Sequence, residues 1–295
     1  MPELPEVQTV VDDLNKKIKG DSIADFWSDW PKAIKGKSLK EFRETINGRK
    51  ILDVRRIGKN IFINLSGGKT LYIHLKMTGH LLIKSEIRNS KSESDAKKQN
   101  YFEDKVNQYV HHGWKLKNRR GKIKNMDFSD MRKFAKIVLD DAEKIKDLPE
   151  IKKLGIDAMD PELTFKKFAK ILEKRKNKPI GLVLLEQELL AGIGNIYRSE
   201  ILFDAGILPT KTVKELKIHD LKKILKSVKK ILKKAIGMRG TSDSDYRDTS
   251  GAPGNFQKIL KVYGRTGKKC LKCDTIIANG KIGQRTFFYC PRCQR

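Results

Sequence analysis

The spacing of the hydrophobic positions changes along the chain. Over residues 3–19 apolar side chains recur at helical spacing and stop before Gly20, which predicts an amphipathic helix. From residue 50 the pattern changes to short β-rich runs, which are typical of an antiparallel sandwich or barrel. The expected strands are 51–57, 61–65, 70–75 and 80–83, and strands resume over 110–139.

The pattern also predicts how the chain divides into domains. Residues 85–108 are polar and rich in Ser, Lys and Glu, which predicts a mobile surface insertion. The acidic stretch 140–161 contains two prolines and fits a linker, and helical stripes follow over 165–172 and 216–232. We expect an α+β multidomain protein with flanking helices on its sheets. Its segments are a β-sandwich over 1–140, a linker over 141–161, a helical domain over 162–262 and a C-terminal hairpin over 263–295.

All four cysteines fall in the last 26 residues, as two Cys-x-x-Cys pairs with 16 residues between them. They are Cys270, Cys273, Cys290 and Cys293. This spacing predicts a zinc ribbon that holds one structural Zn²⁺, because each pair can present two thiolates to a tetrahedral ion. Four sulfur ligands leave no open position, so we expect the metal to fold a hairpin rather than to do chemistry. Two disulfides are the alternative.

The chain carries 64 Lys and Arg against 36 Asp and Glu, a formal net charge of +28. Such a charge attracts a polyanion, and nucleic acid is the expected one. A membrane surface is disfavoured, since no basic amphipathic helix or lipid signal is present, although a solvated Lys-rich surface without a partner is a second interpretation. Neither a membrane span nor a signal-peptide pattern appears. We therefore expect a cytoplasmic, nucleoid-associated protein.

The first residues form a candidate catalytic group. If Met1 is removed, the chain begins with the secondary amine of Pro2, and an α-amino group has a pKa of about 7.7 to 8.0, so part of it is neutral and nucleophilic at pH 7. Attack on an aldehyde carbon would give an iminium that acts as an electron sink. Glu3 and Glu6 lie within one helical turn and can move protons or hold the amine. Alternatively, these residues only start a helix.

The segment 191–200, Ala-Gly-Ile-Gly-Asn-Ile-Tyr-Arg-Ser-Glu, has two glycines before a helix that opens at Asn195. Exposed amides at a helix N-terminus suit phosphate, although a Gly-x-Gly is also found in simple turns. This segment, the opening Pro-Glu-Leu-Pro-Glu-Val, and the Val-Tyr-Gly-Arg before the four cysteines together resemble bacterial formamidopyrimidine-DNA glycosylases. The match keeps its order over nearly the whole chain.

The resemblance implies an N-terminal β-sandwich, a helix-two-turn-helix domain and a zinc finger, with duplex DNA held between the two halves. It implies a base-excision repair enzyme with AP lyase activity that removes oxidised purines such as 8-oxoguanine and formamidopyrimidines. The strand is then cut by β- and δ-elimination. A monomer is expected.

The resemblance also assigns roles to residues. Pro2 corresponds to the nucleophile, Glu3 to the catalytic acid and Glu6 to its supporting carboxylate. Lys59 matches a lysine that contacts phosphate and assists β-elimination, and Arg285 matches an arginine that clamps phosphate and is associated with δ-elimination.

Further positions match residues of the family that contact DNA. His74 resembles a DNA-contacting histidine, and Asn195 a residue that clamps phosphate. Three residues match the trio that fills the gap left by a flipped nucleotide: Met77, Arg132 and Phe134. From the sequence pattern without the resemblance, Met77 and Phe134 would be assigned to the core. Residues 240–257 correspond to the loop that closes over the extruded base.

The sequence departs from the family in places. Ala135 follows Phe134 where glycine is usual, and Met131 replaces a common proline. The DNA-binding histidine corresponds to either His111 or His112, and a basic residue before the Gly-Asn turn is either Lys176 or Lys178. Two other functions are a related glycosylase for oxidised pyrimidines and a non-catalytic protein that binds damaged DNA. An RNA-binding zinc-ribbon protein would leave the N-terminal residues unexplained.

Overall fold

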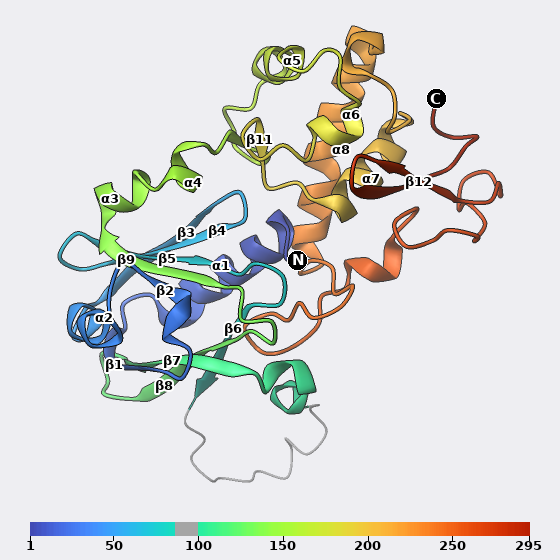
Figure 1. Ribbon diagram of the computed structural model, residues 1–295. Helices are drawn as coiled ribbons and strands as arrows, with labels where there is room; N and C mark the ends of the chain where they lie inside the picture. Colours follow the sequence, from blue (N-terminus) through green and yellow to red (C-terminus); the bar gives the residue numbers. More distant parts are fainter. Residues whose placement is uncertain (86–99) are drawn as a thin grey trace. The chain divides into compact units, whose positions relative to one another are not determined.

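The computed structural model describes residues 1–85 and 100–295 (Figure 1). The chain forms two compact units, each built from several segments. Unit 1 comprises Met1–Pro2, Glu6–Ile151 and Arg239–Gly254. Unit 2 comprises Glu3–Pro5, Lys152–Met238 and Asn255–Arg295.

Unit 1 contains two sheets, with strand orders β1-β7-β8-β6 and β2-β9-β5-β4-β3. Neighbouring strands are antiparallel, except that β2 and β9 are parallel. The strands are β1 (Ser22–Ser28), β2 (Ile34–Lys35), β3 (Ile51–Ile57), β4 (Asn60–Leu65), β5 (Lys69–His74), β6 (His80–Ser85), β7 (Val110–Lys117), β8 (Ile123–Ser129) and β9 (Lys136–Asp141). The expected strands are thus present.

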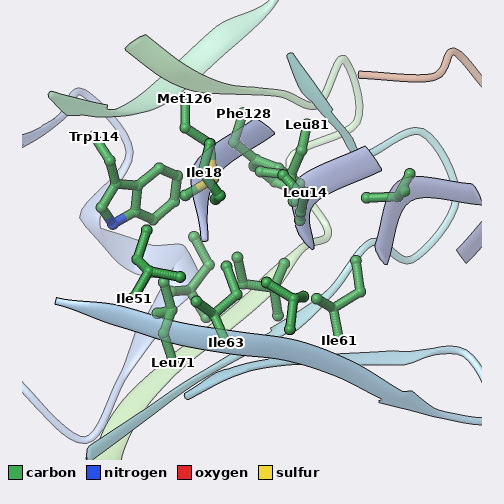
Figure 2. Packing of buried hydrophobic residues seen from close by; sticks show 14 of the residues in the cluster. Leu14, Ile18, Ile51, Ile61, Ile63, Leu71, Leu81, Trp114, Met126 and Phe128 are labelled. Atoms are coloured by element: carbon green, nitrogen blue, oxygen red, sulfur yellow. The ribbon is translucent and has the colours of Figure 1, made fainter. Parts of the chain in front are cut away.

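The core of unit 1 lies between the two sheets. Figure 2 shows Trp114 and Met126 of one sheet facing Ile63 and Leu71 of the other, with Leu14 of helix α1 (Leu4–Ile18) among them. Each fully buried side chain of this kind contributes about 1.5–3 kcal/mol. The apolar face of α1 is therefore used inside the sandwich, and the fold class predicted from the sequence is confirmed.

Some elements of unit 1 were not anticipated. Helix α2 (Leu39–Ile46) begins at a capping box in which Ser38 and Glu41 exchange bonds, a signature that the sequence contains. The predicted linker contains two short helices, α3 (Ala142–Lys146) and α4 (Pro149–Lys152). A short 3-10 helix, η1 (Pro31–Ala33), precedes β2, and two more 3-10 helices are described next.

The predicted insertion over 85–108 falls partly on residues 86–99, which lie outside the described residues. Residues 100–108 form two 3-10 helices, η3 (Tyr101–Glu103) and η4 (Lys105–Asn107). Asn107 is fully buried. This part of the insertion is therefore a folded piece of unit 1 rather than a loose polar loop.

Unit 2 is mainly helical, as predicted. Its helices are α5 (Phe165–Glu173), α6 (Ile180–Val183), α7 (Asn195–Ala205) and α8 (Ile218–Gly237), with the 3-10 helices η5 (Val213–Glu215) and η6 (Phe256–Ile259). Two strands, β10 (Ile156–Asp157) and β11 (Leu190–Ala191), form a short parallel pair, and β12 (Ala278–Ile282) and β13 (Arg285–Tyr289) form the C-terminal hairpin. Helix α7 is buried over most of its length and packs against α8.

No helix among the described residues combines the length and the apolar character needed to span a membrane.

Residues 240–257 were expected with the helical domain, but Arg239–Gly254 groups with unit 1. The reason is a buried charge network with α1. Arg239 donates to Asp13 of α1 at 2.5 Å and to Asp248 at 2.6 Å. Because the Asp13 and Asp248 carboxylates share one guanidinium, the start of the segment is tied both to α1 and to the segment's own Asp248.

Candidate functional site

In unit 2 the Glu3 carboxylate occupies the N-terminus of α7. The main-chain N–H of Gly194 donates to its Oε2 at 2.7 Å, that of Ile196 to Oε1 at 2.9 Å and that of Tyr197 to Oε2 at 3.4 Å. The side chain is buried. A helix N-terminus stabilises negative charge through its free amides and dipole. The amides expected to be exposed for phosphate are therefore bonded to Glu3 instead.

Gly194 is needed for this contact. A Cβ at this position would lie 2.3 Å from Cδ of Glu3. Gly192 is required in the same way, because a Cβ there would lie 2.5 Å from Leu4, whose N–H donates to the Gly192 carbonyl at 3.0 Å. The two glycines of the Gly-x-Gly segment thus admit the first residues of α1, which a simple turn would not require.

In unit 1, Pro2 is buried directly before α1, and Glu6 is buried in its first turn. The main-chain N–H of Thr241 donates to Glu6 Oε1 at 2.7 Å. A Cβ at Gly240 would lie 2.6 Å from the same oxygen, so glycine permits the approach. The Tyr246 hydroxyl donates to the Glu6 carbonyl at 3.4 Å, and burial raises the pKa of Tyr246, which keeps this donor protonated. Glu6 therefore anchors the segment 239–254 beside α1, the helix that Pro2 precedes.

Lys59 lies in the turn before β4, and His74 lies at the end of the neighbouring strand β5. Lys59 is buried in the two-residue turn between β3 and β4, where Gly58 has φ +59°. Strand pairing places His74 opposite Asn60, the residue after Lys59. Burial, followed by the charges of Lys76 and Lys59, lowers the pKa of His74 to about 4. Since Lys76 N–H donates to its Nδ1 at 2.9 Å, the neutral ring carries its proton on Nε2 and can donate to a phosphate oxygen.

The trio predicted from the resemblance is exposed in unit 1. Met77 is 40% exposed and Phe134 is 54% exposed, so the core assignment that the sequence pattern favoured is wrong. The Arg132 guanidinium lies 4.8 Å from the centre of the Phe134 ring. The main-chain N–H of Arg132 donates to Thr78 Oγ1 at 3.1 Å. Asp130 bonds the Thr78 hydroxyl and the Ala135 N–H. These bonds join the loop that contains Met77 and Thr78 to the loop 130–135. Exposed apolar side chains of this size indicate a binding surface.

A buried arginine organises the remaining phosphate candidates of unit 2. Asn195 is the first residue of α7, and Arg285 is exposed at the start of β13. Arg198 donates to Asn195 Oδ1 at 2.5 Å, to the Thr286 carbonyl at 2.8 Å and to the Gly181 carbonyl at 3.1 Å. Burial lowers the pKa of Arg198 to about 10, and it remains charged at neutral pH. Sequence reasoning missed this residue, although it stands inside the quoted Gly-Ile-Gly-Asn-Ile-Tyr-Arg segment.

We expect Arg198→Met to lower the free energy of unfolding by about 3 kcal/mol, because buried acceptors lose a charged donor at about 1–3 kcal/mol each. Urea unfolding of the variant and the parent protein measures this. Lys230→Met is a matched control, since Lys230 makes an exposed ion pair with Asp204. Equal stability of Arg198→Met and the parent would contradict the organising role.

A second buried residue was also missed. Glu200 of α7 accepts hydrogen bonds from the N–H groups of Lys261, Val262 and Tyr263 at 2.9–3.1 Å. Burial raises the pKa of Glu200, whereas these three N–H groups oppose the rise. Glu200 thereby fixes the Val-Tyr-Gly-Arg segment that leads into the cysteine hairpin.

The four cysteines lie together in unit 2. All four are free, and their Sγ atoms lie within 4.8 Å of one another. Four sulfurs at about 2.3 Å from a tetrahedral Zn²⁺ would lie about 3.8 Å apart. The Sγ atoms of Cys270 and Cys293 are 3.9 Å apart, and those of Cys273 and Cys290 are 3.4 Å apart. The donor set and spacing fit one structural zinc ion, and the disulfide alternative does not hold.

The resemblance left open which of two histidines and which of two lysines contacts DNA. These four residues have different surroundings. His112 is buried, where burial lowers its pKa to about 4, and its Nδ1 lies 2.9 Å from Ser28 Oγ. His111 is partly exposed and its Nδ1 lies 2.9 Å from Asp29. Lys176 and Lys178 are both exposed, and Lys178 is paired with Glu186. Of the two histidines, only His111 is accessible to a ligand.

Comparisons with known proteins agree with this geometry. The family model for the formamidopyrimidine-DNA glycosylase N-terminal domain matches residues 1–137, and the model for the H2TH domain of the same family matches residues 154–246. A formamidopyrimidine-DNA glycosylase of Pelotomaculum thermopropionicum is 37% identical and covers 100% of this chain and 99% of its own. One from Carboxydothermus hydrogenoformans is 35% identical, with 100% of both chains covered.

Solved structures agree as well. A complex of Lactococcus lactis Fpg with DNA containing an abasic site has a TM-score of 0.83 at 29% identity and covers 99% of each chain. A complex of an L. lactis mutant with DNA containing Fapy-dG has a TM-score of 0.83 at 30% identity, covering 100% of each. The chain therefore belongs to the formamidopyrimidine-DNA glycosylase family.

Proposed function

We propose that this protein is a base-excision repair DNA glycosylase with AP lyase activity that removes oxidised purines through an imine of Pro2. The observation that carries the proposal is the N-terminal arrangement. Pro2 directly precedes α1, and the next residue presents a buried carboxylate bonded to the N-terminus of α7. Binding DNA without chemistry would not need a secondary amine next to such a carboxylate.

The proposed reaction begins when the neutral Pro2 nitrogen attacks C1′ of the damaged nucleotide. The bond from C1′ to the base breaks and the base leaves with a proton; opening of the C1′–O4′ bond then gives a cationic iminium. Loss of a C2′ proton expels the 3′ phosphate, and a second elimination expels the 5′ phosphate. Water hydrolyses the remaining imine and frees Pro2. The iminium keeps its positive charge at any pH because proline nitrogen is secondary.

The nearby residues are proposed to move protons and hold phosphates. Glu3 exchanges a proton with the opening sugar, and Glu6 holds α1 and the segment beside it. Lys59 contacts the phosphate at the lesion and assists β-elimination. Arg285 contacts a DNA phosphate and assists δ-elimination. Asn195 also contacts a phosphate of the DNA backbone. Backbone contacts of this kind position the duplex, whereas the pocket reads the base.

The exposed trio supports nucleotide flipping. Extrusion of a base costs a few kcal/mol of stacking and pairing, and apolar wedges with an arginine can replace these contacts. We propose that Met77 and Phe134 fill the gap and that Arg132 faces the orphaned base. His74 is proposed to donate to a phosphate. The four cysteines would hold Zn²⁺, which supplies folding energy to the hairpin that carries Arg285.

The substrate of this protein is proposed to be duplex DNA with an oxidised base or an abasic site. The solved L. lactis complexes contain abasic-site DNA and Fapy-dG DNA, which supports this class. We further propose that the protein acts as a monomer on chromosomal DNA in the cytoplasm, in association with the nucleoid.

The test compares cleavage of duplexes that contain 8-oxoguanine opposite cytosine, an oxidised pyrimidine, an abasic site or no lesion. We expect cleavage at 8-oxoguanine and at the abasic site. Cleavage of only the pyrimidine lesion would favour the related glycosylase instead. Tight binding of damaged DNA without any strand cleavage would favour a binding protein.

Glu3→Gln is expected to lower excision of 8-oxoguanine by about 10²–10⁴-fold, the usual range for loss of a proton-transfer group. The amide oxygen of glutamine can replace only one of the two carboxylate oxygens that accept N–H groups of α7, so the fold of the variant has to be verified. Single-turnover kinetics measures the loss, and circular dichroism checks the fold. Glu162→Gln is a matched control on an exposed ion pair with Lys167. Unchanged excision in Glu3→Gln would remove Glu3 from the mechanism.

A further inference from the structure

We propose that residues 100–108 position the segment Arg239–Gly254 and thereby set which bases the enzyme excises. This inference rests on the proposed function, because it takes the segment to be the loop that closes over the extruded base. Residues 100–108 belong to the polar insertion expected over 85–108. Its two positioning residues are Asp104 and Asn107.

The first contact is an ion pair. The Nε and Nη2 atoms of Arg247 donate to Asp104 Oδ2 at 2.9 Å and 2.8 Å. The Arg247 side chain is 13% exposed and that of Asp104 is 33% exposed, so the pair is partly shielded from water. Burial opposes ionisation of Asp104, but the guanidinium bonds outweigh it and lower the pKa of Asp104. Asp104 is therefore charged at neutral pH and holds the middle of the segment.

The second contact is a buried amide. Asn107 Nδ2 donates to the Gly251 carbonyl at 3.1 Å and to the Tyr101 carbonyl at 2.7 Å. Its Oδ1 lies 2.8 Å from His80 Nε2. Burial lowers the pKa of His80, so the ring is neutral and carries one proton, which faces Asn107 Oδ1 on Nε2 or the Thr78 carbonyl, 3.1 Å away, on Nδ1. The amide thus joins β6, residues 100–108 and the segment.

The backbone of the segment is adapted to this amide. Gly251 has φ +78°, and a Cβ at this position would lie 2.8 Å from Asn107 Nδ2 and 3.2 Å from the Tyr101 carbonyl oxygen. Glycine is required both by its backbone conformation and by the space available. In addition, the N–H of Ile83 donates to the Thr249 carbonyl at 2.8 Å. The segment is therefore seated on this surface rather than lying loosely over it.

The same segment reaches the candidate reaction site. Its Thr241 N–H donates to Glu6 Oε1 at 2.7 Å, in the first turn of the helix that Pro2 precedes. Asp104 and Asn107 bond residues 247 and 251 of this segment, whereas Asp13 bonds Arg239 at its start. Substitutions that remove the bonds of Asp104 and Asn107 should disturb the contacts of the segment to an extruded base. They should spare cleavage at an abasic site, where no base has to be recognised.

The experiment uses Asp104→Asn and Asn107→Ala in the full chain, with Asp25→Asn as the matched control. Asp25 makes a comparable two-bond pair with Arg43 on an exposed part of the same unit. We expect kcat/KM for 8-oxoguanine excision to fall about tenfold in Asp104→Asn, the loss of one charge-assisted bond. Cleavage of an abasic-site duplex should stay within about twofold of the parent. Hydrogen exchange in peptides covering 240–254 should accelerate in both variants and not in the control.

A double-mutant cycle with Arg247→Gln tests the pair itself. If Asp104 acts through Arg247, the double variant should excise 8-oxoguanine no more slowly than the worse single variant. Additive losses would show that the two residues act separately and would overturn the proposed link.

The outcomes separate this inference from the proposed function. Unchanged hydrogen exchange in 240–254 would show that residues 100–108 do not hold the segment. Equal losses of excision and abasic-site cleavage would indicate a general structural role and would also overturn the inference. A parent protein that neither excises nor cleaves would contradict the proposed function, while hydrogen exchange would still decide whether the segment is held.

Discussion

Exchange of Pro2 for glycine is expected to lower excision of 8-oxoguanine by about 100-fold or more, a loss of about 2.7 kcal/mol of transition-state stabilisation. Glycine leaves a primary amine, whose imine must be protonated before it withdraws electrons, whereas the iminium of a secondary amine is always charged. The variant also loses the ring that is buried before α1. Borohydride reduction during turnover should therefore trap a covalent DNA complex with the parent protein and much less with the variant.

Two controls make this result specific. Mass spectrometry of the intact protein should show that Met1 has been removed, because a retained methionine converts the Pro2 nitrogen into an amide that cannot attack. An undamaged duplex should give no trapped complex. Equal trapping by the parent and Pro2→Gly with correct N-termini would point to a lysine nucleophile, and Lys59 would be the first residue to replace.

Removal of zinc is expected to have the largest effect on structure. Structural Zn²⁺ sites of this kind contribute about 10–16 kcal/mol of apparent binding energy at pH 7, more than a short hairpin can supply through its own contacts. Chelation, or Cys293→Ala, should therefore unfold the β12–β13 hairpin and displace Arg285. We expect loss of the metal by mass spectrometry under native conditions and fast hydrogen exchange in residues 266–295.

DNA binding gives the functional readout of the same change. If Arg285 contacts a phosphate, the slope of log K against log salt should fall by about 1 in magnitude in Cys293→Ala. Leu271→Ala is the control, because Leu271 lies between the first two cysteines and is 56% exposed. A fully folded hairpin after complete metal removal would refute a structural zinc site.

The sequence determined the features that depend on local spacing. The period of residues 3–19 specified α1, and the short runs at 51–57 and 70–75 specified strands, because a buried face must repeat with the geometry of its element. The two Cys-x-x-Cys pairs specified a four-sulfur site, because each pair spans one tight turn and can present two thiolates to one metal ion. The order of motifs specified the family.

The candidate site was only partly accessible to such reasoning. The resemblance proposed candidate residues, but the sequence did not show what they bond. The carboxylate of Glu3 accepts N–H groups of residues 194, 196 and 197, which are about 190 positions away along the chain. No local pattern encodes a contact of that range. The same limit explains why Arg198 was missed, since an arginine within an apolar helix gives no signal of its three acceptors.

Tertiary structure alone decided which apolar residues are exposed and which polar segments are fixed. Met77 and Phe134 read as core residues but are exposed, because short loops held by Asp130 and Thr78 turn them away from the sandwich. Residues 100–108 were predicted as part of a mobile polar insertion, and residues 240–257 as a loop. The ion pair of Asp104 with Arg247 joins them across 143 positions, so their order depends on a contact that exists only after the two sheets and α1 have packed.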